Sequence, residues 1–334
     1  MEYRDIPNLK QQASRVGLGT WAIGGWMWGG TDVQNAIATI HKALDLGINL
    51  IDTAPVYGFG LSEEIVGKAL QQYGRRSEII VATKTGLGWQ KNRIFRDARK
   101  KSIRAEIEAS LKRLQLDYID LYQVHWPDPL TPLEETAETM QELLEEGKIR
   151  AIGVSNYSTT QMEEFQNDAP LHALQPPYNL FETEIEKDQL AYCLEHSIAT
   201  LGYGSLCRGL LSGKMSKDRQ FTGDDIRKID PKFQEPRFSD YLLCAKKLEE
   251  WALQKYNKPL YALAIRYALD KGISVALWGA RRPEQLEEIE AVWRWSLWPE
   301  DFAEIEQIKK ETLKSPVGPE FMAPPSRLGK PKAA

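Results

Sequence analysis

NLIDTAPVYG, residues 49–58, is a short apolar run that ends in an acid and then turns into a loop carrying a tyrosine. The run is too short for a helix, and Pro55 and Gly58 interrupt regular structure after it. We therefore predict a buried strand that ends at Asp52 and a loop that presents Tyr57. A phenol has an unperturbed pKa of about 10, so Tyr57 needs a neighbouring cation to lower that pKa before it exchanges protons near neutral pH.

Two further apolar runs end in titratable side chains. IIVATK ends in Lys84, and YIDLYQVH ends in His125. If the three runs are neighbouring parallel strands, their C-terminal ends meet at one rim. Asp52, Tyr57, Lys84 and His125 are then expected to form one catalytic cluster. In this cluster Asp52 would hold the Lys84 ammonium, and that ammonium would lower the pKa of Tyr57.

Strand-like runs alternate with helical periodicity along most of the chain. This alternation predicts parallel strands joined by right-handed helical crossovers. Eight such units favour a closed (β/α)8 TIM barrel of the α/β class over an open, doubly wound sheet. The strands are expected near residues 16–20, 49–53, 79–84, 118–125, 150–154, 172–176, 198–203 and 274–278.

The helices are placed by their apolar periodicity and by capping residues. Ser62, Thr131 and Ser158 are expected to be N-caps. The helices are expected near residues 32–46, 62–73, 101–114, 133–146, 159–167, 185–196, 240–256 and 283–291, with extra helices near 258–271 and 299–313.

Three segments lie outside the repeating units. Residues 2–15 are expected to form a short N-terminal hairpin. Residues 204–239 form a long connection after the seventh strand, and a loop of this length predicts a lid or a ligand belt. Residues 315–334 form a proline-rich C-terminal tail. We expect the whole chain, residues 1–334, to be a single barrel domain.

Composition and charge exclude several classes of function. The net charge is -4 with acidic and basic residues interspersed, so neither nucleic acid nor an anionic membrane is an expected partner. No apolar run approaches the roughly 18 residues that span a bilayer, and no signal-peptide pattern is present, so a soluble cytoplasmic protein is expected. The three cysteines have no paired spacing, and His125 is the one histidine at the predicted rim. Neither a disulfide framework nor a metal site is therefore expected.

Other interpretations of the same residues stay open at this stage. Gly17-x-Gly19-x-x-Ala22 formally matches the dinucleotide fingerprint, but no acid follows about 20 residues later, which disfavours a Rossmann fold. Lys84 could form a Schiff base, although a neighbouring acid favours its protonated form. Lys84 and Asp52 could also be a purely structural ion pair.

Several segments together resemble the aldo-keto reductase family, and the resemblance covers nearly the whole chain. Besides residues 49–58, the matching segments are GLGTW (17–21), ATK (82–84), DYIDLYQVHWPD (117–128) and GVSN (153–156). Two further segments, YGSLCRGLL (203–211) and PVGPEFM (316–322), are most similar to the bacterial general-stress branch of that family.

The resemblance implies a nicotinamide cofactor and a catalytic tetrad of Asp52, Tyr57, Lys84 and His125. GARRPEQLEE (279–288) resembles the family segment that binds the adenosine 2′-phosphate, and a guanidinium suits that dianion, so the cofactor is expected to be NADPH or NADP+. The residues implied for cofactor binding are Thr20, Trp21, Asp52, Ser155, Asn156, Gln175, Tyr203, Ser205, Leu206, Arg208, Lys214, Gly279, Arg281, Gln285 and Glu288.

The expected function is NADPH-dependent reduction of an aldehyde or ketone, with Tyr57 as the general acid. Tryptophans in the loops predict an apolar substrate site formed by Trp21, Trp26, Trp28 and Trp126. The expected partner is a small carbonyl compound, and a monomer is favoured. Two other functions stay open: an aldolase-like lyase that uses Lys84, and an NADPH-binding regulatory subunit with little turnover.

Overall fold

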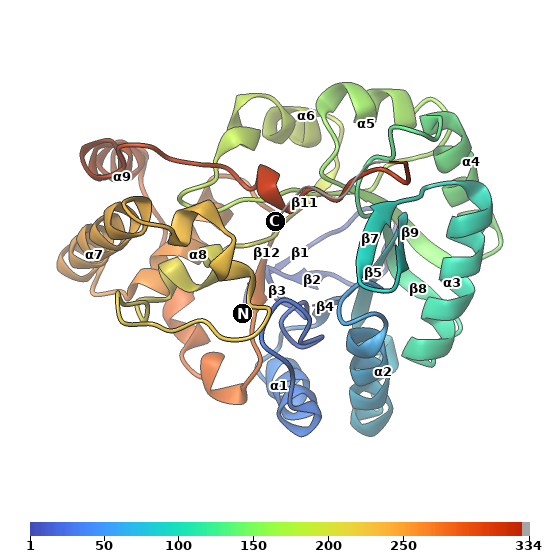
Figure 1. Ribbon diagram of the computed structural model, residues 1–334, viewed down its shortest axis with the longest axis horizontal. Coiled ribbons are helices and arrows are strands. Elements are labelled where there is room, and N and C mark those ends of the chain that lie inside the picture. Colours follow the sequence, from blue (N-terminus) through green and yellow to red (C-terminus); the bar gives the residue numbers. More distant parts are fainter. Residues whose placement is uncertain (329–334) are drawn as a thin grey trace.

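Eight parallel strands close into a barrel in the computed structural model, which describes residues 1–328 (Figure 1). Each strand pairs with the next one along the chain, and the last pairs with the first. The predicted (β/α)8 barrel is therefore confirmed. The barrel strands are β3 (Val16–Gly19), β4 (Leu50–Asp52), β5 (Ile80–Thr85), β8 (Ile119–Val124), β9 (Ile149–Ser155), β10 (Ala173–Gln175), β11 (Ala199–Gly202) and β12 (Val275–Gly279).

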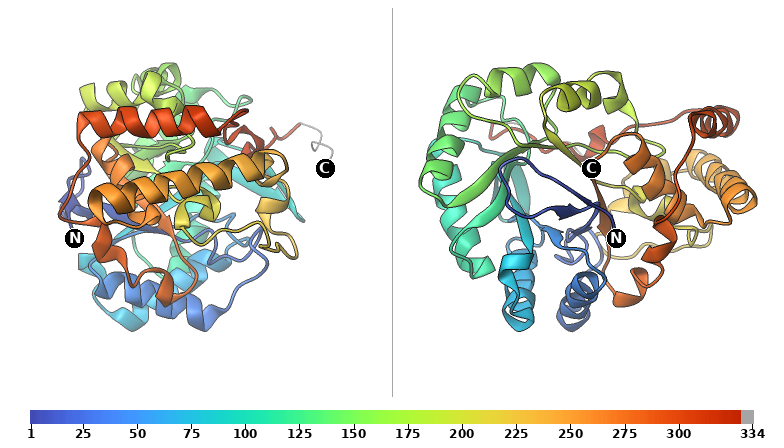
Figure 2. Two further views of the ribbon diagram at one scale, coloured as in Figure 1. Left: turned by 90° about the vertical axis from the view of Figure 1, so that its left-hand side faces the viewer. Right: turned by 180° about the vertical axis from the view of Figure 1, so that it is seen from behind.

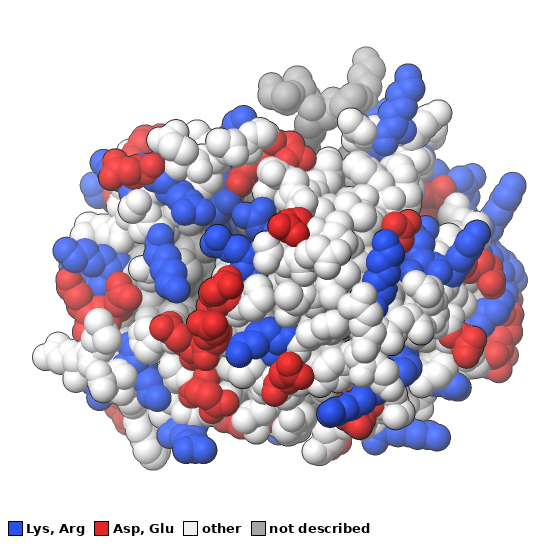
Figure 3. Space-filling view, turned by 90° about the horizontal axis from the view of Figure 1, so that it is seen from below, with Lys and Arg blue, Asp and Glu red and all other residues white. Residues whose placement is uncertain are grey.

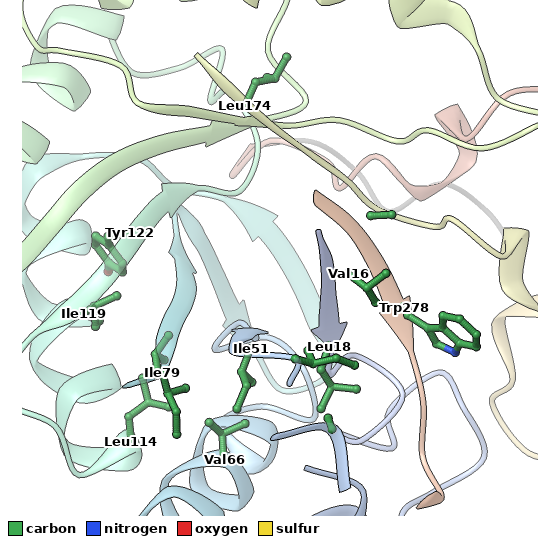
Figure 4. Packing of buried hydrophobic residues seen from close by; sticks show 14 of the residues in the cluster. Val16, Leu18, Ile51, Val66, Ile79, Leu114, Ile119, Tyr122, Leu174 and Trp278 are labelled. Carbon is green, nitrogen blue, oxygen red and sulfur yellow. The ribbon is translucent and has the colours of Figure 1, made fainter. Parts of the chain in front are cut away.

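Helices cover the barrel because the outward side chains of its strands are apolar. Ile51 of β4 lies against Val66 of α2 in one buried cluster (Figure 4). Side chains alternate along a strand, so Ile80 and Ala82 of β5 belong instead to the cluster in the barrel lumen. The helices are α1 (Val33–Asp45), α2 (Leu61–Tyr73), α3 (Lys100–Leu114), α4 (Leu133–Glu145), α5 (Thr159–Phe165), α6 (Gln189–Glu195), α7 (Arg237–Tyr256), α8 (Leu260–Asp270) and α9 (Pro299–Thr312).

A short hairpin closes the N-terminal end of the barrel, as predicted for residues 2–15. β1 (Tyr3–Arg4) pairs antiparallel with β2 (Ala13–Ser14), and Ile6 packs into the lumen cluster with Leu50. The view from behind in Figure 2 shows this hairpin lying across the barrel end. In such barrels the active site lies at the opposite end, where the C-terminal ends of the strands meet.

The extra helices form a layer beside the barrel. α7 and α9 run side by side (Figure 2), and the Lys255 ammonium joins them through ion pairs with Asp301 at 2.6 Å and Glu304 at 2.9 Å. Leu248 and Ile305 pack in the second apolar cluster, between these helices and α8. The extra helices expected near residues 258–271 and 299–313 are confirmed as α8 and α9.

Two elements of the structure differ from the sequence prediction. Residues 283–291 do not form an α-helix but two 3₁₀ turns, η6 (Pro283–Gln285) and η7 (Ile289–Val292), and the Tyr261 hydroxyl donates to the Glu288 carbonyl between them. A second hairpin, β6 (Leu87–Gln90) with β7 (Arg93–Arg96), follows β5 and was not expected.

Of the three expected N-caps, Ser158 alone is confirmed, with a complete capping box. The hydroxyls of Ser62 and Thr131 form hydrogen bonds with side chains instead of with a helix N-terminus. Ser62 Oγ donates to Thr20 Oγ1 at 2.8 Å, and α2 begins at Leu61. Thr131 Oγ1 donates to the Asp128 carboxylate at 2.7 Å.

Two acids from the helix layer hold the strand that carries Lys84. Thr83 Oγ1 donates to Glu63 Oε1 at 2.7 Å, and Thr85 Oγ1 donates to Glu106 Oε2 at 2.6 Å. Because side chains alternate along β5, both threonines face the helices while Lys84 faces the barrel mouth. The position of Lys84 is thus fixed from both sides.

Glu63 and Glu106 differ in whether a cation pairs with them. Arg113 Nε donates to Glu63 Oε2 at 2.6 Å, whereas Glu106 forms no ion pair within residues 1–328. Burial raises the pKa of Glu106 to about 8, although hydrogen bonds from Thr85 and the Gly86 amide act in the opposite direction. Glu106 is therefore protonated at neutral pH.

The raised pKa of Glu106 predicts a pH-dependent stability. Between about pH 5 and about pH 8 the folded protein keeps a proton that the unfolded chain has released, so the free energy of unfolding should fall as the pH rises. Glu106→Gln keeps an acceptor for Thr85 and removes this titration. Urea denaturation at several pH values should show a flatter profile for Glu106→Gln than for wild type. Glu108→Gln, an exposed position on the same helix, is the control, and equal slopes for all three proteins would refute the prediction.

Candidate active site

Lys84 contacts two of the other predicted catalytic residues, Asp52 and Tyr57, at the barrel mouth. Its ammonium nitrogen lies 2.6 Å and 2.9 Å from the two Asp52 carboxylate oxygens. It also donates to the Thr53 carbonyl at 3.0 Å and to the Tyr57 hydroxyl oxygen at 3.3 Å. The Lys84 side chain has no exposed surface, and that of Asp52 is 4% exposed. The predicted contact between the lysine, the acid and the phenol is therefore present.

His125 completes the cluster from the end of β8. Its ring meets the Tyr57 ring edge-on, with centroids 5.8 Å apart. Burial lowers the pKa of His125 well below its usual range, and the positive charge of Lys84 adds to this effect. His125 is therefore neutral at physiological pH and can donate one N–H hydrogen bond into the mouth.

The direction of the Tyr57 shift corrects an expectation. Lys84 was expected to lower the pKa of Tyr57, but burial raises this pKa well above its ordinary value, and the charge of Asp52 adds in the same direction. Burial is the main reason, and the Asp52 carboxylate, which lies closer to the ammonium than the phenol does, adds to it. Tyr57 is consequently held in its protonated form.

Two glycines fix the loop that presents Tyr57. Gly58 has a φ of +68°, and a Cβ added there would collide with the Gly24 carbonyl oxygen. A Cβ on Gly24 would lie 2.6 Å from the carbonyl carbon of Tyr57. The loops after β3 and β4 thus pack backbone against backbone, which side chains at these positions would prevent.

Amide and hydroxyl side chains surround the cluster at the ends of β9, β10 and β11. Gln175 Nε2 donates to Asp52 Oδ2 at 2.8 Å, and the Tyr203 hydroxyl donates to Asn156 Oδ1 at 2.9 Å. Asn156 has a φ of +61° and its amide donates to the His125 carbonyl at 3.0 Å, so the side chain is held in one orientation. Ser155 Oγ donates to the Gln175 carbonyl at 2.7 Å.

All of these groups open into one pocket of about 790 Å³. Every residue expected above to bind cofactor or substrate lines it, including the four tryptophans. Lys84 lies behind Asp52 and Tyr57 rather than in the lining. The pocket also includes groups that the sequence did not indicate: Arg219 and Arg227 from the loop after β11, Leu87 and Ile94 from the second hairpin, and Phe321 and Met322 from the tail.

Arg208, which also lines the pocket, forms buried ion pairs. Its guanidinium donates to Glu182 at 2.7 Å and also pairs with Asp230, and both acids are buried. Burial opposes the ionisation of Glu182, but Arg208 and Lys232 outweigh it and lower the pKa of Glu182 to about 2. Arg208 therefore belongs to an internal ion-pair network at the pocket wall, and the expectation that it binds cofactor stays a prediction.

A group of guanidinium side chains lies at another part of the lining. Arg281 Nη1 donates to the Trp28 carbonyl at 2.7 Å, and Gln285 Oε1 accepts from the Arg281 amide at 2.8 Å. Burial lowers the pKa of Arg281, and the nearby charges of Arg227, Arg282 and Arg219 act in the same direction, whereas Asp225, which pairs with Arg227, acts against them. Such crowding of positive charge favours an anionic ligand.

The long loop after β11 reaches across the pocket. The Asp224 carboxylate accepts from the Met27 amide at 2.8 Å and the Gly29 amide at 3.0 Å. The Ile226 amide donates to the Met27 carbonyl at 2.9 Å. Residues from the loop after β3 and the loop after β11 are thereby joined above the barrel.

Outside the pocket, acidic and basic side chains are mixed over the face shown in Figure 3. Across residues 1–328 the structure contains no helix with the length and apolar character needed to cross a membrane. In the same part of the chain there is no group of three or more His, Cys, Asp or Glu side chains placed to hold a metal ion.

The chain is similar in sequence and in structure to known proteins. A sequence model of the Aldo/keto reductase family matches residues 15–310. The chain is 58% identical to the aldo-keto reductase YhdN of Bacillus subtilis over 98% of this chain and 99% of that protein. It is 38% identical to the NADH-specific methylglyoxal reductase of Escherichia coli, over 82% and 88% of the two chains. The structure of the glycerol dehydrogenase AKR11B4 from Gluconobacter oxydans is similar, with a TM-score of 0.87 and 52% identity over 96% of this chain and 99% of that one.

The close packing of the loops after β3 and β4 predicts that Gly58 is sensitive to substitution. Gly58→Ala should lower the free energy of unfolding by about 3 kcal/mol, because a positive φ and a backbone collision act together. Gly74→Ala is the matched control, since Gly74 has a φ of +76° but open space around its missing Cβ, and its loss should be about 1 kcal/mol. Urea denaturation measures both values. Equal losses of unfolding free energy in the two variants would contradict the close approach of Gly58 to the Gly24 backbone.

Proposed function

The chain belongs to the aldo/keto reductase family, as its segments suggested, and from that premise we propose its reaction in detail. Members of this family are oxidoreductases that generally use a nicotinamide cofactor. We propose that this protein reduces aldehydes or ketones to alcohols with NADPH and that Tyr57 supplies the proton. The observation that carries the proposal is the contact of the Lys84 ammonium with Asp52 and Tyr57 at the pocket wall.

The lining of the pocket fits such a cofactor chemically. Amide and hydroxyl side chains lie beside Tyr57, and guanidinium groups gather on the loops after β11 and β12. Asn156, Ser155 and Gln175 would hold the carboxamide, and Tyr203 would lie against the nicotinamide ring. When bound, the reduced nicotinamide supplies the hydride.

In this proposal, side chains of the protein supply the proton and stabilise the negative charge that its transfer leaves behind. Tyr57 is kept protonated by burial and donates its proton to the carbonyl oxygen. The phenolate that results lies 3.3 Å from the Lys84 ammonium, which stabilises the new negative charge. Asp52 keeps Lys84 charged, and neutral His125 orients the carbonyl by a hydrogen bond. General-acid catalysis of this kind contributes about 10² to 10⁴ in rate.

The choice of NADPH rests on the guanidinium cluster rather than on the family. The Escherichia coli relative carries the name of an NADH-specific enzyme, so family membership leaves the choice open. Arg281 lies among Arg219, Arg227 and Arg282, and a dianionic phosphate relieves their mutual repulsion.

The substrate side of the pocket supports a neutral, apolar carbonyl compound. Trp21 stacks on Tyr57 with centroids 6.0 Å apart, and Trp126 follows His125 directly. Leu87 and Ile94 extend the apolar lining. A Schiff-base lyase fits less well, because Lys84 is fully buried and its three N–H donors already face the Asp52 carboxylate, the Thr53 carbonyl and the Tyr57 hydroxyl.

Tyr57→Phe tests the proton donor. Loss of the hydroxyl should lower kcat by about a thousandfold while NADPH affinity stays within about twofold, because the ring and its stacking on Trp21 are kept. Oxidation of NADPH with a panel of aldehydes measures turnover, and fluorescence titration measures affinity. Full activity in this variant would end the assignment. Tight NADPH binding without turnover in wild type would instead favour the regulatory subunit, and substrate trapped on Lys84 by borohydride would favour the lyase.

Arg281→Met tests the choice of cofactor. Removing the guanidinium should raise the KM for NADPH about ten- to a hundredfold, because charge-assisted hydrogen bonds to the phosphate are lost. The KM for NADH should change by less than about threefold. Arg75→Met, an exposed position far from the pocket lining, is the control. Equal effects on both cofactors would show that Arg281 does not recognise the phosphate.

A further inference from the structure

The C-terminal tail crosses the barrel mouth as a strap, which we define as residues 315–327. Figure 1 shows this segment in red, running from α9 across the barrel toward β7. Near its start, the Val317 amide donates to the Tyr241 hydroxyl at 3.1 Å, and Lys232 Nζ donates to the Gly318 carbonyl at 3.1 Å. The first end of the strap is therefore fixed on α7 and on the loop after β11.

The other end pairs with the second hairpin. The Arg96 amide donates to the Pro325 carbonyl at 2.9 Å, and Arg96 Nε donates to the Pro324 carbonyl at 2.8 Å. Arg96 also forms a parallel bridge with Ser326. Its guanidinium lies 5.2 Å from the ring of Trp126, so this end of the strap lies beside the residue that follows His125.

Arg327 fastens this end to two loops of the barrel. Its Nη1 pairs with the Asp128 carboxylate and lies 3.0 Å from Asp97 Oδ1, and its Nη2 donates to the Leu130 carbonyl at 3.0 Å. The Asp128 side chain has no exposed surface, and within residues 1–328 Arg327 is its one ion-pair partner. Asp128 belongs to the segment DYIDLYQVHWPD, yet the tetrad leaves it without a role.

Between the two fixed ends, the strap forms part of the pocket. Phe321, Met322, Pro324 and Pro325 all line it, and none of them carries a charge. Phe321 lies over the Arg208 guanidinium, 5.7 Å from it. The strap thus adds an apolar wall to the side of the pocket that holds Trp126.

We propose that Arg327 is a specificity-determining positioning residue, which locks residues 321–325 as a fixed wall of the substrate site. The inference rests on the reductase function proposed above. The locked wall limits the size of a neutral carbonyl substrate and holds a small one close to Tyr57. The planar guanidinium matters because its two terminal nitrogens reach Asp97, Asp128 and a carbonyl oxygen together, whereas a lysine would present all its donors from one nitrogen. Without Arg327, Asp128 would lose its ion-pair partner and keep only hydrogen bonds from its neighbouring loops, and the end of the strap would lose its ionic attachment to the barrel.

The test compares Arg327→Ala with Arg327→Lys and with Leu328→Ala, whose side chain is 86% exposed at the next position. Propanal serves as the small substrate and 2-naphthaldehyde as the bulky one. Arg327→Ala should change the ratio of kcat/KM for the two aldehydes about tenfold in favour of the bulky one. Arg327→Lys should restore this ratio in part, and Leu328→Ala should leave it unchanged. NADPH affinity should stay within about twofold in all three.

Hydrogen exchange gives a second readout that needs no turnover. The Arg96 amide is protected by the Pro325 carbonyl, and the Met322 and Ala323 amides are protected within the strap. All three should exchange at least about tenfold faster in Arg327→Ala than in wild type. Unchanged exchange, or an unchanged substrate ratio in an active enzyme, would overturn the proposal. If wild type reduces neither aldehyde, the proposed function fails, and the exchange rates still decide whether Arg327 locks the strap.

Discussion

The buried ion pair between Lys84 and Asp52 is the interaction on which the rest of this structure depends. Removing a charge from water is costly, and breaking a buried pair by deleting one partner typically costs about 3 to 5 kcal/mol. Hydrogen bonds from neighbouring groups offset the cost of burying these two charges, because Gln175 and Gln123 donate to Asp52 and the Thr53 carbonyl accepts from Lys84. The pair is tolerated because it is fully hydrogen-bonded, and Tyr57 lies beside it.

The fold holds this pair in place from several directions. Glu63 and Glu106 fix the strand on both sides of Lys84 from the helix layer. Close packing of the loops at Gly24 and Gly58 fixes the loop that carries Tyr57. Closure of the barrel brings the ends of β4, β5 and β8 to one rim. A small movement of any one of these elements would change the distance between the ammonium and the phenol, and catalysis is sensitive to such changes.

The sequence predicted the parts that depend on local pattern. Eight alternating strand and helix units indicated the barrel, and the strand ends at Asp52, Lys84 and His125 located the site. It did not predict the direction of the Tyr57 pKa shift, because that direction depends mainly on how deeply the folded chain buries the phenol. Nor did it reveal the internal ion pairs of Arg208 or the contact of Arg327 with Asp128, which lie 199 residues apart. Such contacts depend on how distant loops meet, and residue spacing carries no information about that.

The raised pKa of Tyr57 changes the role assigned to its neighbours. In the proposed reaction Tyr57 is the general acid, which must hold its proton until the carbonyl oxygen gains negative charge, and burial together with Asp52 favours the protonated phenol. The phenolate that follows would be costly in the same buried site, unless a cation is already in place. Lys84 provides that cation without any movement, which is how a preorganised site lowers a barrier. In the proposed reaction the ion pair would thus act on the product of proton transfer rather than on the resting phenol, and the apolar walls around it would strengthen the effect by keeping water away.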